Sequence, residues 1–333
     1  MLRARTSLAL DDPDRLADLL PDAPGDGTAD LADYASLFDA PLPRYAESVS
    51  PALHPLHPNA AGRGRGGASN AFAAAAQLSA AGGAILANDP HLQLTAPSIW
   101  YLARLELSTG GVIGGTIPGM PIVLTGRSDR LAWGITSSHL DDIDLYVEEL
   151  NPDNPEQHRT PEGWEEFETS REIIEIADST PVTITLRETE NGPVIPGSHF
   201  DFATVTPPGH VMSMAWTALT DENTSIQTGL KLMRAHTIEE ALEAGEDFVA
   251  PSQNLMVASV DGRIAMQVIG HMPWRSTQHE TRARMPSPGW KEENRWLGVT
   301  QYFANPTFVD PEGGLLGNTN NKTVDRDFPL HLS

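Results

Sequence analysis

Ser69 directly follows a glycine-rich segment, and this position suits a nucleophile. The segment Gly62–Gly67 reads GRGRGG and gives the backbone the freedom for a strained turn. If the bond between Ala68 and Ser69 is cut, Ser69 becomes the first residue of a new chain. Its own α-amino group, with a pKa of about 7.7–8, can then take the proton from the hydroxyl. The alternative interpretation is a solvated linker followed by the first residue of a strand.

Several short segments further along the chain occur in a characteristic order. They are NDPHL at residues 88–92, IPGMPIVLTG at 117–126, LAWGITS at 131–137, DDIDLY at 141–146, APSQN at 250–254 and NTNNK at 318–322. Together with Ser69-Asn70, these segments resemble the penicillin acylase family of N-terminal-nucleophile (Ntn) hydrolases. The resemblance extends over roughly residues 60–330 and depends on the ordered set, because none of the segments is decisive alone.

The resemblance implies a four-layer αββα sandwich, here partial and rich in strands, whereas the sequence pattern alone indicates only an α+β fold. It also implies that residues 1–68 are the remnant of a first (α) subunit with a glycine-rich spacer. Residues 69–333 would then be the N-terminal part of the β subunit. Cleavage of one precursor would produce an α/β heterodimer. Cleavage in the family usually follows a glycine, and here it would follow Ala68.

The resemblance also implies the roles of three residues besides Ser69. His91 matches a position that contacts the N-terminal serine, although a loop histidine after Pro90 is the alternative. Ser137 would supply a backbone N–H, and Asn320 a side-chain N–H, to the oxyanion that forms in acyl transfer. An amide suits this role because it donates without titrating. Taken alone, the segment around Asn320 would be interpreted as a polar turn.

Two further groups of residues follow from the same correspondence. The acyl pocket would be lined by aliphatic and polar side chains, which favours an aliphatic acyl group over a phenyl group; these residues are Leu92, Leu124, Thr125 and Ile135. A structural calcium site would use Asp141, Asp144 and the carbonyl of Ile143, since Ca²⁺ prefers oxygen ligands. The alternative is an exposed acidic loop. No organic cofactor is expected.

The expected function is that of an amidohydrolase acting through an acyl-enzyme on Ser69. The substrate would be a small acyl amide, such as a penicillin, a cephalosporin side chain or an N-acyl-homoserine lactone. A second hypothesis is a catalytically inactive protein with the acylase architecture, acting as a fold remnant or a binding domain. A third is a Ser-His-Asp hydrolase using His139 and Asp142, although the chain has no G-x-S-x-G elbow.

Composition excludes several partner classes. The 333 residues carry a net charge of −23 and no cysteine, so nucleic acid is an unsuitable partner and disulfides are excluded. The acidity fits either adaptation to high salt or a GC-rich genome. No apolar run is long enough to cross a membrane. The opening MLRARTSLAL is too short for a clear signal peptide, which favours the cytoplasm, although related proteins are often exported.

Local patterns predict where the elements lie. We expect a helical region over Gln227–Phe248, containing a capping box at Thr237, and a hairpin turn at Asp261-Gly262. Strands are expected at Ile99–Leu107, Ile122–Leu124, Leu131–Thr136, Ile173–Ile176, Val182–Leu186 and His210–Trp216, and a short helix at Ala29–Phe38. The pair His54 and His57 fits a loop better than a metal site, because prolines hold the segment extended.

Overall fold

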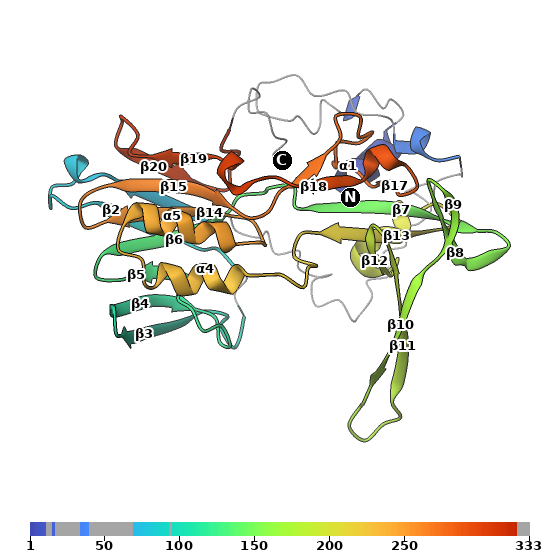
Figure 1. Cartoon of the computed structure of the whole chain (residues 1–333), viewed down its shortest axis with the longest axis horizontal. Coiled ribbons are helices and arrows are strands. Elements are labelled where there is room, and N and C mark those ends of the chain that lie inside the picture. The colour runs from blue at the N-terminus through green and yellow to red at the C-terminus, as the bar shows by residue number, and fades with distance from the viewer. Residues whose placement is uncertain (11–14, 17–33, 40–68, 93–94, 325–333) are drawn as a thin grey trace. The chain divides into compact units, whose positions relative to one another are not determined.

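The structure is a computed structural model that describes residues 1–10, 15–16, 34–39, 69–92 and 95–324 (Figure 1). The chain forms two compact units. Unit 1 comprises Met1–Ala52, Ile143–Trp216 and Pro273–Val299, and unit 2 comprises Leu53–Asp142, Thr217–Met272 and Thr300–Ser333. The predicted cleavage residue Ala68, the glycine-rich segment and the pair His54 and His57 lie outside the described residues, as does the first half of the helix predicted at Ala29–Phe38.

Unit 2 contains two sheets and a helical layer. The larger sheet has the order β19 (Thr307–Val309), β15 (Ile264–Ile269), β14 (Gln253–Ser259), β6 (Leu131–Ser137), β5 (Thr125–Arg127), β4 (Gly110–Thr116) and β3 (Tyr101–Leu107). The smaller sheet has the order β2 (Ile85–Asp89), β1 (Asn70–Ala74) and β20 (Leu315–Asn318). The helices are α4 (Ser225–Leu232) and α5 (Ile238–Ala244), with short 3₁₀ turns at Ala76–Leu78, Gly245–Asp247 and Tyr302–Ala304.

The central strands of the larger sheet, β6, β14 and β15, are covered on both faces. On one face, Trp133, Leu255 and Val257 pack against Ile238 and Ala241 of α5. On the other face, small side chains of β1 contact methionines and alanines of β14 and β15; this second core contains Ala71, Ala73, Ala75, Met256, Ala258, Ile264 and Met266. Because both faces are covered, nearly every residue of β14 and β15 is buried, without the alternation of a half-exposed strand.

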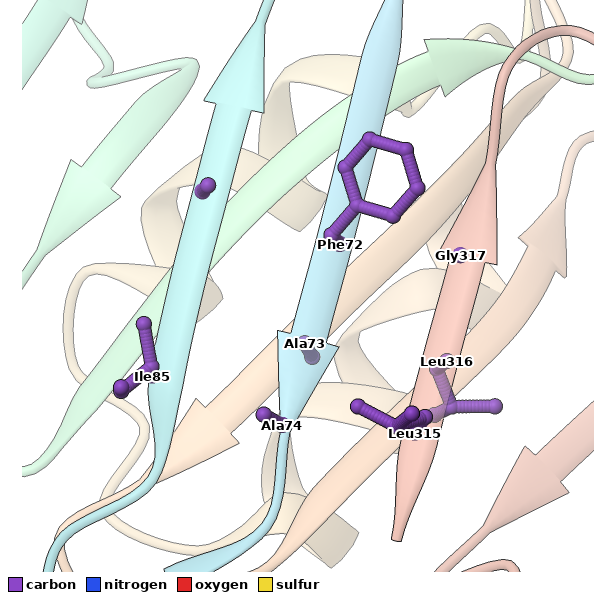
Figure 2. Close-up of a pocket in the computed structure, with 8 residues that line it drawn as sticks. Phe72, Ala73, Ala74, Ile85, Leu315, Leu316 and Gly317 are labelled. Atoms are coloured by element: carbon purple, nitrogen blue, oxygen red, sulfur yellow. The ribbon is translucent and has the colours of Figure 1, made fainter. Parts of the chain in front are cut away.

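The outer face of the smaller sheet carries a shallow apolar groove (Figure 2). Phe72, Ile85 and Leu315 are 50%, 53% and 63% exposed, and small residues such as Ala74 lie between them. No helix among the described residues packs on this face. The described part of unit 2 therefore consists of a helical layer followed by two sheets.

Unit 1 is built on an eight-stranded sheet. Its order is β10 (Glu168–Ile174), β11 (Val182–Thr189), β12 (Gly192–Ile195), β13 (His210–Trp216), β7 (Ile143–Asn151), β8 (Asn154–Thr160) and β9 (Gly163–Glu166), with β17 (Ser287–Pro288) parallel to β7. A separate two-stranded antiparallel sheet consists of β16 (Pro273–Arg275) and β18 (Trp296–Val299). The helix α1 (Leu2–Ala9) and 3₁₀ turns at Tyr34–Leu37, His199–Thr204 and Glu292–Asn294 complete the unit. The hairpin of β10 and β11 projects from its sheet (Figure 1).

Most of the predicted elements are present. The helical region is divided at Thr237, and a second helix begins there as the capping box predicts, because the Thr237 hydroxyl accepts from the Glu240 N–H at 3.2 Å. Gly262 adopts φ +88° in the predicted turn between β14 and β15. The strand predicted at Ile122–Leu124 is wrong. Ile122 instead packs against α4, where a Cβ on Gly229 would lie 2.5 Å from its side chain.

Among the described residues, no helix is long and apolar enough to span a bilayer.

Unit 1 buries a carboxyl group, Glu148, in the middle of β7. Its Oε1 accepts hydrogen bonds from Ser213 Oγ at 2.5 Å, Asn191 Nδ2 at 3.0 Å and Thr189 Oγ1 at 3.1 Å. Its Oε2 faces the backbone at Gly289, where a Cβ would collide with it. Burial raises the pKa of Glu148, while the hydrogen bonds from Ser213 and Asn191 act in the opposite direction.

We predict that Glu148→Gln stabilises the protein at neutral pH. Because the folded-state pKa is raised, the folded protein binds the proton more tightly than the unfolded chain. Stability therefore falls as pH rises from about 4.3, the ordinary glutamate pKa, through the raised folded-state pKa. A glutamine keeps the oxygen acceptor and never ionises. Urea unfolding at a series of pH values should show a gain that is largest at neutral pH and shrinks toward pH 4.3, roughly the unfolded value.

The matched control is Glu149→Gln on the same strand, which removes only the 2.9 Å ion pair with Arg159. Such partly exposed pairs contribute about 0–1 kcal/mol, so a small effect is expected. A gain for Glu148→Gln that did not change with pH would contradict the prediction.

Candidate active site

Ser69 immediately precedes β1, the central strand of the smaller sheet. The register pairs Ala71 with Asn88 of β2 on one side and with Asn318 of β20 on the other. Ser69 is two residues before Ala71, and Asn320 is two residues after Asn318. Both residues therefore leave the paired region at the same end of the sheet. The strand order thus brings together two predicted catalytic residues that are far apart in the sequence.

His91 contacts Ser69 through its main chain. The His91 N–H donates to Ser69 Oγ at 3.2 Å. The imidazole is directed to Asp89, with Nδ1 3.1 Å from the Asp89 carbonyl oxygen and 3.5 Å from its carboxylate. The structure therefore places His91 beside the serine, but the contact is made by a backbone amide and not by the predicted side chain.

Asn88 joins the two sheets beside Ser69. Its Nδ2 donates to the carbonyl of Asn70 at 2.9 Å and to the carbonyl of Ile135 at 3.0 Å. Its Oδ1 accepts from Thr125 Oγ1 at 2.8 Å and from the Ile135 N–H at 3.2 Å. The amide thus uses both of its hydrogens and both acceptor positions. A Cβ on Gly134 would lie 2.6 Å from Asn88 Cβ, so only glycine permits this approach.

Asn320 is in contact with Ser137, the other predicted oxyanion residue. Its Nδ2 donates to the Ser137 carbonyl at 2.9 Å, and its backbone is left-handed, with φ +63°. The turn is held by Asn318, whose Oδ1 accepts from the Asn320 N–H at 2.9 Å. A side-chain amide has two hydrogens, so Asn320 can bind Ser137 and still donate to a substrate oxygen.

The Ser137 N–H points away from β14. In antiparallel strands, pairs that exchange hydrogen bonds alternate with pairs that do not. Val260 N donates to Arg130 O at 3.0 Å and Ser138 N to Ser252 O at 3.4 Å, and the register between them is unbroken. Ser137 therefore belongs to a pair without hydrogen bonds. On its other side, β5 pairs only with the beginning of β6. The Ser137 N–H lies on the strand edge from which Asn320 approaches.

A buried polar network supports this arrangement and was not predicted from the sequence. Thr136 Oγ1 donates to Asn318 Oδ1 at 2.8 Å and accepts from Asn254 Nδ2 at 3.1 Å. All three residues are buried, and the two asparagines end the APSQN segment and begin the NTNNK segment. Those segments were the signal that could have identified the asparagines, although only Asn320 was assigned a role.

The predicted pocket residues are divided between two places. Leu124 and Ile135 pack against the core beneath α4 and α5, and Thr125 binds Asn88. Leu92 is half exposed and adjoins His91. The groove in Figure 2 shares none of these four residues. Of the four, Leu92 is the residue that directly follows His91, whose N–H donates to Ser69 Oγ.

The predicted calcium ligands do not form a suitable donor set around Asp144. Ile143 and Asp144 are the first two residues of β7, and Asp141 precedes them in the sequence. Both carboxylate oxygens of Asp144 accept hydrogen bonds from the Arg275 guanidinium, each at 2.9 Å. Calcium takes six to eight oxygen ligands, by the usual range. In the part of the chain that the structure describes, no three His, Cys, Asp or Glu side chains are placed to hold a metal ion.

We predict that Asn88→Ala destabilises unit 2. The substitution leaves two carbonyls and two donors without their partner, and each such loss costs about 1–3 kcal/mol when the group stays buried. Urea unfolding should therefore show a loss of about 2 kcal/mol or more. Asn305→Ala is the control for the two donated bonds, because Asn305 Nδ2 also binds two backbone carbonyls, at 3.1 and 3.0 Å.

The two variants should differ at Ser69. Only Asn88→Ala should change hydrogen exchange of the His91 amide, because Asn88 holds the strand that leads to it and Asn305 does not. A change in stability below about 0.5 kcal/mol, typical of surface substitutions, would show that Asn88 does not connect the sheets.

Comparison with known proteins identifies the family of the chain. The profile of the penicillin amidase family matches residues 1–333. The acyl-homoserine lactone acylase QuiP of Pseudomonas aeruginosa is 31% identical over 271 residues, which are 80% of this chain and 32% of that protein. The penicillin acylase 2 proenzyme of Pseudomonas sp. strain SE83 is 28% identical over 80% of this chain and 33% of its own length.

A solved structure shows the same fold. The thermostable penicillin G acylase from Alcaligenes faecalis superposes with a TM-score of 0.69 at 26% identity, over 78% of this chain and 45% of that chain. The predicted partial Ntn-hydrolase fold is thereby confirmed. The chain spans about a third of the length of the curated relatives given above. On the evidence of sequence and fold together, the chain belongs to the penicillin amidase family.

Proposed function

We propose that this chain carries the nucleophile and the oxyanion donors of an amidohydrolase. The observation that supports the proposal is the convergence of Ser69, Ser137 and Asn320 at one end of the smaller sheet, with Asn320 bound to Ser137. The family relatives named as acylases agree with this chemistry. An exposed N-terminal serine supplies nucleophile and base in one residue.

The proposed reaction has two stages. The α-amine of Ser69 takes the hydroxyl proton, and Oγ attacks the carbonyl carbon of the acyl amide. The resulting oxyanion accepts hydrogen bonds from the Ser137 N–H and Asn320 Nδ2. The proton then passes to the leaving nitrogen, the C–N bond breaks and an ester remains on Ser69. Water, deprotonated by the same amine, attacks the ester, and the carboxylic acid leaves as Oγ regains its proton.

Self-cleavage would use the same oxygen. Ser69 Oγ attacks the Ala68 carbonyl, the peptide bond breaks as the acyl group moves to oxygen, and water hydrolyses the ester. The products are a carboxylate on Ala68 and a free amine on Ser69. The hydrogen bond from the His91 N–H to Ser69 Oγ favours this step, because it orients the hydroxyl and stabilises charge on the oxygen.

We predict that the purified protein consists of two fragments broken between Ala68 and Ser69. Intact-mass spectrometry should show both fragments, and Ser69→Ala should remain a single chain because it lacks the attacking oxygen. Ser79→Ala, which changes a partly exposed serine after a 3₁₀ turn in the same unit, should be cleaved normally. An uncut, folded chain in all three proteins would instead favour an inactive acylase-like fold.

We propose an aliphatic acyl group as the preferred substrate feature, since Leu92 adjoins the residue that binds Ser69. The processed protein should hydrolyse a long-chain N-acyl-homoserine lactone with a kcat/KM about tenfold or more above that for a phenylacetyl amide, because pocket fit discriminates by such factors. Mass spectrometry of the released amine measures both rates. Leu92→Ala should reduce this ratio, and Ser69→Ala should abolish both reactions. Equal or reversed preference would contradict the assignment.

A further inference from the structure

One face of β7 carries buried polar side chains at three successive alternate positions. Asp144, Tyr146 and Glu148 occupy alternate positions and are almost fully buried, at 2%, 1% and 0% exposure. The segment that leads from β16 to β18 supplies a partner for the first two. Arg275 binds Asp144, and the Asn294 carbonyl accepts from Tyr146 Oη at 2.9 Å. On this face the segment is therefore held on β7 by polar contacts, and its Met285 and Trp290 also belong to the apolar core that contains Val147 of β7.

Asp144 and Arg275 form a two-pronged ion pair. Arg275 Nε is 2.9 Å from Asp144 Oδ2, and a terminal nitrogen of the same guanidinium is 2.9 Å from Oδ1. The arginine side chain is 8% exposed, so both charges are removed from water. This parallel fork matches the shape of a carboxylate and is stronger than contacts between neutral groups.

Trp296 completes the surroundings of the carboxylate. Its indole N–H donates to Asp144 Oδ2, and its ring lies 6.0 Å from the Arg275 guanidinium carbon. Arg275 and Trp296 are paired across the two-stranded β16–β18 sheet, at a bulge that interrupts the register after Trp274. This small sheet thus presents a cation and a neutral donor to one buried anion.

We propose that Arg275 is a built-in cation at the position where the family pattern predicts calcium, and that this part of the protein needs no metal ion to fold. A carboxylate that stays ionised when it is buried needs a compensating positive charge. The guanidinium supplies that charge, and it occupies both oxygens that a metal would bind. The Asp144–Arg275 pair connects β7 to β16, although the two residues are 131 positions apart in the sequence.

The first test measures metal dependence in the unchanged protein. After dialysis against EGTA and return to buffer with or without millimolar CaCl₂, elemental analysis should find no bound calcium, and the Tm should be the same in both buffers. Stoichiometric calcium, or a Tm that falls in EGTA and recovers in CaCl₂, would overturn the proposal. This measurement needs no variant, so it decides the question even if a substituted protein fails to fold.

The second test concerns the ion pair itself. Arg275→Met should lower the Tm by about 5–15 °C, because it leaves a buried carboxylate uncompensated. Arg263→Met is the matched control, since Arg263 contacts two carboxylates but is 40% exposed, and its effect should be small. The double variant Asp144→Asn with Arg275→Met should melt above either single variant. If the decrease in Tm of the double variant equalled the sum of the two single decreases, the charges would not compensate each other.

Discussion

The two sheets of unit 2 touch at Asn88 and Gly134, and the position of Ser69 depends on this contact. Asn88 binds the Asn70 carbonyl on one sheet and both backbone groups of Ile135 on the other. Without a Cβ at residue 134, the asparagine side chain can lie against the backbone of β6. The alanines of β1 allow the same close approach further along the strand. The small side chains of β1 and the fully hydrogen-bonded amide of Asn88 thus determine how β1 lies over β6.

Much of this fold could be predicted from sequence. Local signals were sufficient for the hairpin at Gly262 and for β13, because each depends on a turn residue or on a short strand-forming run. Ile122–Leu124 gave a false signal, because an apolar run has the same composition whether it pairs in a sheet or fills the space below a helix. Here it fills the space opened by Gly229 of α4.

The candidate site was only partly predictable, for a different physical reason. Ser69, Ser137 and Asn320 could be identified because their neighbours in the sequence form short, recognisable segments. The contact between His91 and Ser69 is made by a main-chain amide, which leaves no mark on residue type. The partner of Asp144 could not be predicted either, because Arg275 lies on the distant strand β16 and no sequence pattern near either residue indicates the pairing. Partners that are brought together by tertiary structure leave no periodic pattern in the chain.

The apolar groove on the smaller sheet has a consequence for how the protein behaves in concentrated solution. The groove exposes apolar side chains, Phe72, Ile85 and Leu315, on a molecule whose net charge is −23. Mutual repulsion keeps such molecules apart when the ionic strength is low. At about 1 M salt the Debye length shrinks to roughly 3 Å, and apolar contact is then no longer opposed at longer range. Self-association of the protein therefore depends on the balance between charge repulsion and apolar contact at this groove. The salt concentration of the purification buffer shifts that balance.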